Sequence, residues 1–385
     1  MNNKIKWILK GSKTAYFLYN RILSTLLRFW GLFLRIDKKL ILVNSYGGAK
    51  YNDNTKAIYE YMQNNPEYNS YKIIWSFDKL PENAPKNIVW VKNNSISFFK
   101  TALKAKYWIT NSSMERGLKF KKNKTIYINT HHGSVIKKID KSNDRMAFRV
   151  SRPNYVYAQS QIDVDYFTEK WGLPKGVLQL SGYPRNDTLA KVTNKEIKAI
   201  KEKLKLPADK KIILYAPTYR DNDYDKNGCY IAPPMNIEKW RKKLSNDYIL
   251  IFRAHYEISK SLNIKKNDSF VKDYTDYEDV NDLLKVSNVL ISDYSSIIID
   301  YSILERPIFC FAYDYDKYIK ERGTAYDLKK ELPNGITTNE DELISAIKNC
   351  NYKLQSEKTR KFKNKHVEVY GNASAYIDKI ILEKG

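Results

Sequence analysis

A chain of 385 residues is too long for one ordinary hydrophobic core and has the length of two domains of the usual size. Its hydrophobic content of 43% and charged content of 29% are those of a globular protein and exclude long disordered segments. The formal net charge of +24 predicts a polyanionic partner, which leaves nucleic acid, an anionic membrane surface and phosphate-bearing substrates open.

Residues 1–38 are apolar but regularly interrupted by lysine and arginine. The longest charge-free run, Thr14–Asn20, is far shorter than the ~20 residues that span a bilayer. Arg21, Arg28 and Arg35 also break the apolar core that a signal peptide needs, and their spacing of seven places them along one stripe of a helix. The apolar side chains that can lie elsewhere on this helix are Phe17, Leu18, Leu26, Trp30 and Phe33. We expect an amphipathic, membrane-associating helix, against the alternative of a helix packed on the protein's own core or in a dimer interface.

From residue 39 onward, short apolar runs alternate with stretches of helical period such as 54–63 and 97–105. The predicted strands of the first half are LILVNSY (40–46), KIIWSF (72–77), NIVWV (87–91), KYWITN (106–111), TIYIN (125–129), NYVYAQ (154–159) and VLQLSG (177–182). Strands that alternate with helices indicate βαβ units and a parallel sheet. We therefore expect a Rossmann-like domain over residues 39–190.

The second half repeats this organisation after a lysine-rich stretch at 191–206. Its predicted strands are KIILYAP (211–217), YILIFRAH (248–255), NVLISD (288–293) and IFCFAYD (308–314). We expect a second Rossmann-like domain over residues 191–385, whose last helix can pack back on the first domain. Two doubly wound lobes bind ligands where the carboxyl ends of their strands face the cleft.

Several common site patterns are absent or weak. The chain has neither a Walker A loop nor GxGxxG, and Gly47-Gly48-Ala49-Lys50 fits a plain turn and a substrate loop equally well. The three cysteines, at 229, 310 and 350, have no CxxC pair and no histidine at zinc-ligand spacing, which predicts a reducing, cytosolic chain without a structural metal. The DxD sequences at 163–165 and 314–316 are interpreted as surface or capping residues.

Two of the four histidines follow the strand TIYIN, in the sequence Thr130-His131-His132-Gly133-Ser134. Gly133 permits a sharp turn there, and Lys137-Lys138 follow shortly afterwards. Histidine is the side chain best suited to proton transfer near neutral pH, so we favour a catalytic role over a structural one. A fourth histidine, His366, lies in a basic stretch and is expected to be solvated.

A second candidate group follows the strand YILIF. Arg253 and His255 stand two residues apart and so on one side of an extended strand, where they can form an anion clamp. An edge histidine bound to a neighbouring loop is nearly as good an interpretation of this pair.

The segment SDYSSIIIDYSILERPIFCF, 292–311, predicts a buried strand that ends at Asp293 and a helix that starts near Ser295 and Ser296. Hydroxyl groups and backbone N–H groups at a helix start favour phosphate binding. Asp300 follows Ser296 by four residues and shares its helical face. The alternative is simple capping of the helix, which explains one of these residues but not their clustering.

The order of several segments resembles the CDP-glycerol glycerophosphotransferases, the family of teichoic acid primases and polymerases. The matching segments run from residue 40 to GNASAYIDKIIL and include YNDNTKAIYEYM, AKYWITNS, INTHHGSVIKK, SGYPRND, LYAPTYRD, FRAHY and SDYSSIIIDYSILERPI. The resemblance implies an α/β fold of the glycosyltransferase-B (GT-B) type. The C-terminal lobe would bind CDP-glycerol, and the N-terminal lobe would receive a lipid-linked acceptor at the cytoplasmic face of the membrane.

The resemblance also implies residue roles. His132 matches the family's histidine-glycine motif and would be the general base, whereas His131 stands where relatives have tryptophan and would fill an aromatic slot. His255 would be the second catalytic histidine and would stabilise the leaving CMP. The substrate-binding residues implied are Gly133, Lys137, Thr218, Arg220, Arg253, Asp293, Ser295, Ser296 and Asp300. No metal and no cofactor are expected.

Three other functions remain open at this point. One is transfer of ribitol phosphate from CDP-ribitol, and another is a nucleotide-sugar glycosyltransferase of the same fold, in which Glu305 would grip the sugar. The third is nucleic-acid binding, which only the charge suggests and which leaves the strand-end histidines unexplained. We therefore expect no nucleic-acid partner.

Overall fold

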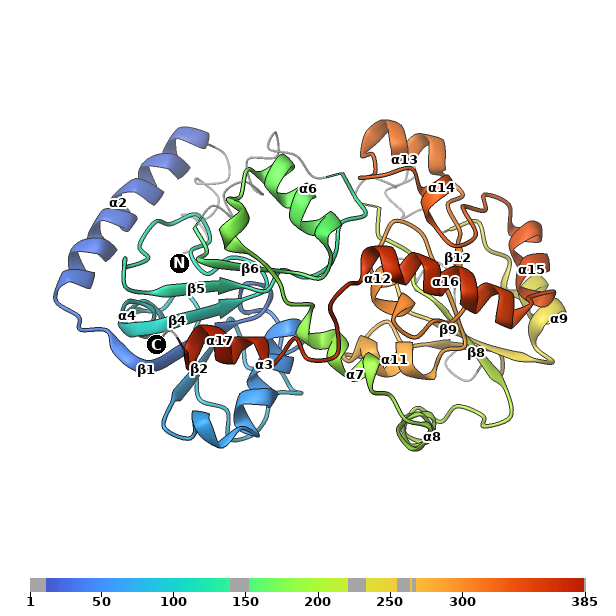
Figure 1. Cartoon of the computed structure of the whole chain (residues 1–385), viewed down its shortest axis with the longest axis horizontal. Helices are drawn as coiled ribbons and strands as arrows, with labels where there is room; N and C mark the ends of the chain where they lie inside the picture. Colours follow the sequence, from blue (N-terminus) through green and yellow to red (C-terminus); the bar gives the residue numbers. More distant parts are fainter. Residues whose placement is uncertain (1–11, 139–151, 221–232, 255–263, 265–267, 384–385) are drawn as a thin grey trace.

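The computed structural model describes residues 12–138, 152–220, 233–254, 264 and 268–383, which form two lobes side by side (Figure 1). Lobe 1 is built on a sheet of seven parallel strands in the order β3-β2-β1-β4-β5-β6-β7. Its strands are β1 (Asp37–Asn44), β2 (Lys72–Phe77), β3 (Trp90–Lys92), β4 (Ala105–Thr110), β5 (Ile126–Asn129), β6 (Tyr155–Ala158) and β7 (Leu178–Leu180).

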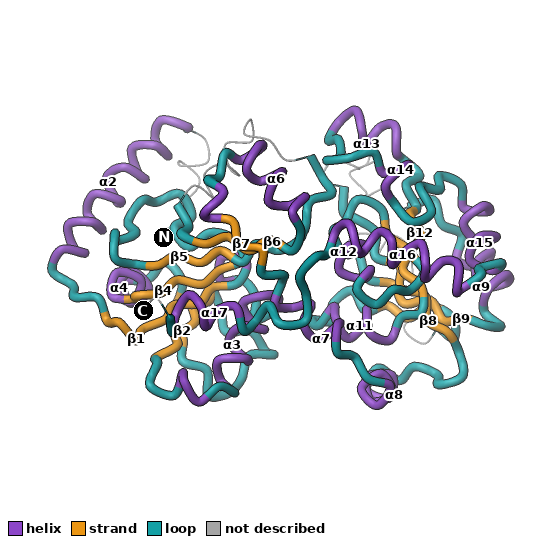
Figure 2. The backbone as a smooth tube through the Cα atoms, viewed as in Figure 1, coloured by secondary structure: helices purple, strands orange, loops and turns teal. Residues whose placement is uncertain are grey.

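Lobe 2 is built on a five-stranded parallel sheet in the order β10-β9-β8-β11-β12. Its strands are β8 (Lys211–Tyr215), β9 (Tyr248–Phe252), β10 (Val271–Asp273), β11 (Val289–Ser292) and β12 (Ile308–Cys310). Each sheet lies inside its lobe with helices around it (Figure 2). Two parallel α/β lobes confirm the predicted fold class.

Helices cover both sheets. Those of lobe 1 are α2 (Lys13–Leu32), α3 (Asp53–Gln63), α4 (Ile96–Lys104) and α6 (Gln161–Trp171). Those after lobe 1 are α7 (Asp187–Ala190), α8 (Asn194–Lys203), α9 (Ile237–Leu244), α11 (Val280–Val286), α12 (Ile297–Ser302), α13 (Tyr315–Glu321), α14 (Leu328–Glu331), α15 (Glu340–Lys348), α16 (Tyr352–His366) and α17 (Tyr376–Ile381). Short 3₁₀ turns that matter below are η1 (Tyr46–Gly48), η3 (Lys175–Val177) and η4 (Pro184–Asn186).

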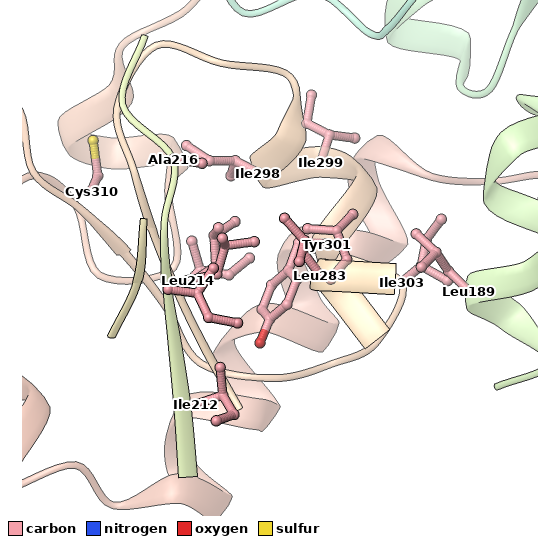
Figure 3. Close-up of a cluster of buried hydrophobic side chains, with 14 of the residues drawn as sticks. Leu189, Ile212, Leu214, Ala216, Leu283, Ile298, Ile299, Tyr301, Ile303 and Cys310 are labelled. Atoms are coloured by element: carbon pink, nitrogen blue, oxygen red, sulfur yellow. The ribbon is translucent and has the colours of Figure 1, made fainter. Parts of the chain in front are cut away.

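The inner parts of the long strands are largely apolar because helices pack on both faces of each sheet, although β1 begins with the exposed residues Asp37, Lys38 and Lys39. In lobe 1, Ile41, Leu42 and Val43 of β1 are fully buried. In lobe 2, side chains of β8, α11 and α12 form the core shown in Figure 3. Leu189 of α7 packs against this core from the segment that links the lobes (Figure 3).

The last described helix, α17, returns to lobe 1. Ile377, Ile380 and Ile381 lie in the same buried cluster as residues of β1, β2 and α3, and Figure 1 shows the red helix beside that sheet. The hydroxyl groups of Tyr61 and Tyr68 donate to the carboxylate of Asp378 at 2.5 and 2.6 Å. The core of lobe 1, whose strands come first in the sequence, is thus completed by the last described helix of the chain.

Helix α2 lies along the outer edge of lobe 1, away from lobe 2 (Figure 1). Leu23, Leu27 and Trp30 pack on the core of lobe 1, and the ammonium group of Lys122 donates to two carbonyl groups near the helix end, those of Gly31 and residue 34. Among the described residues, no helix is long and apolar enough to cross a membrane.

The main differences from expectation concern short elements. Strand β10 has three residues and was not predicted, because so short a run carries no periodicity. Strand β12 ends at Cys310 rather than at 314, and β9 ends at Phe252, which places Arg253 in the following loop.

Candidate active site

Both sheets reverse their strand order at one point, between β1 and β4 in lobe 1 and between β8 and β11 in lobe 2. Ligands of open parallel sheets bind at the carboxyl ends of the strands beside such a switch point. In lobe 1 these ends carry Tyr46 and Asn111, and in lobe 2 they carry Thr218 and Asp293.

The turn after β5 brings the two lobes together. Gly133 has φ +147°, and a Cβ atom built on it would overlap Ser296 Oγ and lie 3.0 Å from Ser296 Cβ. The chain then enters lobe 2, where Ile136 is buried in the core and Lys137 forms an antiparallel bridge with Thr324. The histidine-glycine turn and the start of α12, predicted separately, are therefore in contact.

His132 is exposed, and hydrogen bonding fixes its tautomer. Its Nδ1 lies 3.1 Å from the carbonyl oxygen of Asn111, and since a carbonyl oxygen can only accept, Nδ1 carries the proton. The lone pair of the neutral ring is then on Nε2, as a general base requires. The ring is held between His131, with centroids 4.4 Å apart, and Tyr46 at 6.0 Å.

His131 belongs to an aromatic cluster. Its ring centroid lies 5.2 Å from Phe167 and 5.3 Å from Trp171, and its Nδ1 donates to the carbonyl oxygen of Gly133 at 2.7 Å. Burial, aided by the neighbouring His132, lowers the pKa of His131 well below its usual value, so the ring is neutral. Its Nε2 is buried and has no hydrogen-bond partner among the described residues. These contacts are those of a packing residue.

The surface interpretation of the first DxD sequence holds for Asp165, which is exposed, but is wrong for Asp163. Asp163 is 1% exposed and accepts hydrogen bonds from Ser134 Oγ at 2.6 Å and from the backbone N–H of Val135 at 3.0 Å. Burial raises its pKa to about 6, although these hydrogen bonds oppose the shift. Gln159 Nε2 also donates to Ser134 Oγ, at 2.7 Å. Asp163 therefore fixes the turn just after Gly133.

The carboxylate of Asp300 is hydrogen-bonded to side chains of the protein. Its two oxygens accept from Arg185 Nη2 and Asn186 Nδ2, both at 2.8 Å. Arg185 Nη1 donates in turn to Asp53 at 2.7 Å. The three charged side chains, called the Asp53–Arg185–Asp300 triad below, are 6%, 10% and 8% exposed. They connect α3 and η4 of lobe 1 with α12 of lobe 2.

Arg220 and Asp293 likewise form an ion pair with each other. Arg220 Nη2 donates to Asp293 at 2.9 Å, its Nε donates to Asp314 at 2.8 Å, and another of its N–H groups donates to the carbonyl of Thr218. Asp293 also accepts from the backbone N–H of Thr218 at 2.9 Å. In the second DxD sequence Asp316 is exposed, whereas Asp314, at the N-cap position of α13, has a side chain only 11% exposed, so the surface interpretation is wrong for Asp314. This cluster joins the ends of β8, β11 and β12.

Arg253 keeps more capacity for an anion. Among the described residues, Nη1 is the guanidinium nitrogen that donates, to the carbonyl groups of Tyr274 and Tyr277. Burial lowers its pKa, with Asp279 and Tyr46 acting in the opposite direction, so the guanidinium lies near lobe 1 as well. Ser295 and Ser296 precede α12, which has six residues. His255 lies outside the described residues, and the substrate roles of all these residues stay predictions.

Sequence reasoning missed four residues around His132: Tyr46, Asp53, Asn111 and Arg185. Asp53, Asn111 and Arg185 lie in segments used for the family resemblance, and Tyr46 ends the predicted strand 40–46, but their type gave no local signal of chemistry. The expectation for His366 was wrong, because this residue is 2% exposed and its Nε2 donates to Glu331 at 2.7 Å.

No cluster of three or more histidine, cysteine, aspartate or glutamate residues suited to a metal occurs in the part of the chain that the structure describes. The expectation of a metal-free and cofactor-free site stays a prediction.

A histidine whose Nε2 can accept a proton, held against the ends of β1 and β4 beside the switch point of one parallel-sheet lobe and next to a second such lobe, fits a group-transfer enzyme with a GT-B-like fold. The family model of CDP-glycerol:poly(glycerophosphate) glycerophosphotransferases matches residues 26–383. The chain therefore belongs to this family.

Known relatives agree with the family model. The chain is 36% identical over 332 residues to the teichoic acid glycerol-phosphate transferase of Staphylococcus aureus, covering 81% of this chain and 84% of that protein. It is 35% identical over 370 residues to the teichoic acid poly(glycerol phosphate) polymerase of Staphylococcus epidermidis, covering 90% of this chain but spanning only 51% of the relative. A structure of the wall teichoic acid polymerase TagF has a TM-score of 0.85 and 32% identity, covering 97% of each chain.

Proposed function

We propose that this protein transfers glycerol phosphate from CDP-glycerol to a hydroxyl group of a lipid-linked acceptor and releases CMP, in the synthesis of teichoic acid or a capsular polymer. The acceptor oxygen attacks the phosphorus atom that carries glycerol. The bond from this phosphorus to the CMP oxygen breaks, and His132 Nε2 takes the hydroxyl proton. The tautomer of His132, fixed by the carbonyl of Asn111, is the observation that carries this assignment.

Positioning and charge stabilisation account for most of the rate in phosphoryl transfer. Lobe 2 offers the guanidinium of Arg253 and the hydroxyl groups of Ser295 and Ser296 for the leaving CMP. Glu305, which a nucleotide-sugar enzyme would need for the sugar, forms ion pairs with Arg360 and Lys363 of α16 instead, at 2.9 and 2.6 Å. These contacts favour an alditol phosphate donor over a nucleotide sugar.

The experiment is acceptor-dependent CMP release with CDP-glycerol and, separately, CDP-ribitol. We expect turnover with CDP-glycerol and a loss of about 100- to 10,000-fold in His132→Ala, which removes the base. The matched control is His131→Phe, which keeps an aromatic ring in the cluster with Phe167 and Trp171 and should retain most activity. Undiminished turnover in His132→Ala, or turnover with CDP-ribitol alone, would contradict the assignment.

We also propose that α2 binds the anionic surface of the membrane, at its cytoplasmic face. The apolar side chains on the outer side of α2 are at least 46% exposed, and they are Tyr16, Phe17, Leu18, Ile22, Leu26, Phe29 and Leu32. Arg21 and Arg28 are exposed on the same helix. Exposed apolar and cationic side chains on one helix favour the boundary between headgroups and acyl chains of anionic lipids.

Because the inner side of α2 packs on lobe 1, point substitutions test this proposal better than a deletion. Ile22→Glu with Phe29→Glu should abolish cosedimentation with vesicles that contain anionic phosphatidylglycerol. The control Ile96→Glu introduces one such charge at a site that is 79% exposed on α4, and should bind normally. Equal binding by both variants would refute the role of α2.

A further inference from the structure

Asp53, the first residue of α3, adopts an unusual backbone conformation. Its φ is +64°, in the left-handed region that residues other than glycine rarely adopt, and its side chain is 6% exposed. Such conformations persist where the surroundings hold a residue in place, and they concentrate at functional sites. The hydrogen bonds of this carboxylate therefore need an explanation.

One oxygen of Asp53 is bound by two residues that both contact His132. Tyr46 donates its hydroxyl to Asp53 Oδ2 at 2.6 Å, and Asn111 donates its side-chain amide to the same oxygen at 3.0 Å. The ring of Tyr46 lies against His132, and the main-chain oxygen of Asn111 accepts from His132 Nδ1. The carboxylate is thus one residue removed from two of the contacts that orient the imidazole, those of Tyr46 and Asn111.

The other oxygen of Asp53 connects to lobe 2 through Arg185. The two ends of the guanidinium donate to Asp53 at 2.7 Å and to Asp300 at 2.8 Å. The same guanidinium lies beside the histidine-glycine turn, since a Cβ atom on Gly133 would be 3.3 Å from Arg185 Nη2. Arg185 therefore links α12 to the Asp53 carboxylate, which binds the neighbours of His132.

We propose that Asp53 is a positioning residue for His132, and that Arg185 and Asp300 fix the same carboxylate relative to lobe 2. The proposal rests on the function proposed above. Asp53 holds Tyr46 and Asn111 in place, so that Nε2 of His132 faces the acceptor hydroxyl. The triad carries a net charge of −1, which favours the imidazolium ion formed when His132 takes the proton.

Ionisation of Asp53 fits this role. Burial alone would raise its pKa, but Arg185 and the hydrogen bonds from Tyr46 and Arg185 lower it below its usual value, with a further contribution from His132. Among the described residues, the titratable groups beside the imidazole include Tyr46 from η1, His131 from its own turn and Asp53 from α3. Arg185 pairs with Asp53 and Asp300, and Arg253 lies near Tyr46.

The test measures kcat, KM for CDP-glycerol and the pH dependence of kcat/KM in Asp53→Asn. We expect kcat to fall about 10- to 100-fold, as for a misplaced catalytic group, with KM changed less than about threefold. Loss of the negative charge should move the acid-side midpoint of the profile to lower pH, whereas Arg185→Met should move it to higher pH. Opposite shifts are not expected from a merely structural role.

Two further variants keep the test decisive. Tyr46→Phe retains the ring against His132 and removes only the hydroxyl that binds Asp53, so it serves if Asp53→Asn does not fold, and it should lower kcat in the same way. Asp268→Asn breaks the two-pronged ion pair with Arg241 in lobe 2, at 2.6 and 3.0 Å, and should lower the melting temperature without moving the profile.

The outcomes separate this inference from the proposed function. If the wild-type protein releases no CMP from CDP-glycerol, the proposed function fails. If His132→Ala is inactive while Asp53→Asn and Tyr46→Phe keep wild-type kcat and unshifted profiles, the function stands and the positioning role is refuted.

Discussion

Gly133→Ala is expected to damage stability and catalysis together. At φ +147° a side chain strains the backbone by about 1–3 kcal/mol. The new methyl group also overlaps Ser296 Oγ and lies 3.0 Å from Ser296 Cβ, and overpacking of this kind costs about 1–3 kcal/mol. The combined loss of about 2–6 kcal/mol lowers the melting temperature of a lobe-sized unit by at least about 4 °C. Displacement of His132 from the start of α12 should reduce kcat/KM about 100-fold.

Calorimetry and CMP release measure these two effects. Gly176→Ala is the matched control, because nothing lies within 4 Å of a Cβ atom on Gly176, and it should leave both quantities nearly unchanged. The double variant Gly133→Ala with Ser296→Gly removes the overlap and should recover the packing part of the stability loss, but not the backbone part. A Gly133→Ala protein as stable and as active as the wild type would refute the argued contact between the lobes.

Three further predictions concern stability. Asp163 has its pKa raised to about 6 by burial, so its stabilising contribution is present below pH ~4 and is lost as pH rises through 6. Denaturant titrations should show the wild type losing up to about 3 kcal/mol between pH 4 and 7 relative to Asp163→Asn, and parallel pH curves would contradict this. Arg220→Met leaves Asp293 and Asp314 buried without their counter-ion and should cost about 3–5 kcal/mol, seen as a lower denaturation midpoint; an unchanged midpoint would refute the pairing. Ile380→Ala in α17 should cost about 2–5 kcal/mol and unfold lobe 1 first, as amide hydrogen exchange in β1 and β2 would reveal, whereas unchanged exchange there would count against it.

Much of the fold was predictable because most of its strands have local hydrophobic patterns in the sequence. Apolar runs of four to six residues bounded by polar loops marked the long strands, and the ends of these strands then singled out His132, Arg253 and Asp293 as candidate site residues. Strand β10 was missed because three residues carry no period. The dual character of α2 was also missed, since the sequence offered a membrane face and a core face as alternatives, and the helix has both inner apolar packing and exposed apolar residues.

The partners of the polar side chains were not predictable. Arg185 is separated by 132 residues from Asp53 and by 115 from Asp300, and no periodicity relates residues so far apart. For the same reason, the sequence presented Arg220 as a candidate ligand, although the fold brings Asp293 and Asp314 to it. A charged residue at a strand end can meet a substrate or a distant counter-ion, and only tertiary structure distinguishes the two.

The packing of α17 on lobe 1 has a consequence for how the protein is made. Domains usually fold in the order in which the ribosome releases them. Here the sheet of lobe 1 is complete after residue 180, yet Ile377, Ile380 and Ile381 complete its core almost 200 residues later. Nascent lobe 1 must therefore wait with an open apolar face while all of lobe 2 is translated, and this interval is when chaperones would bind it.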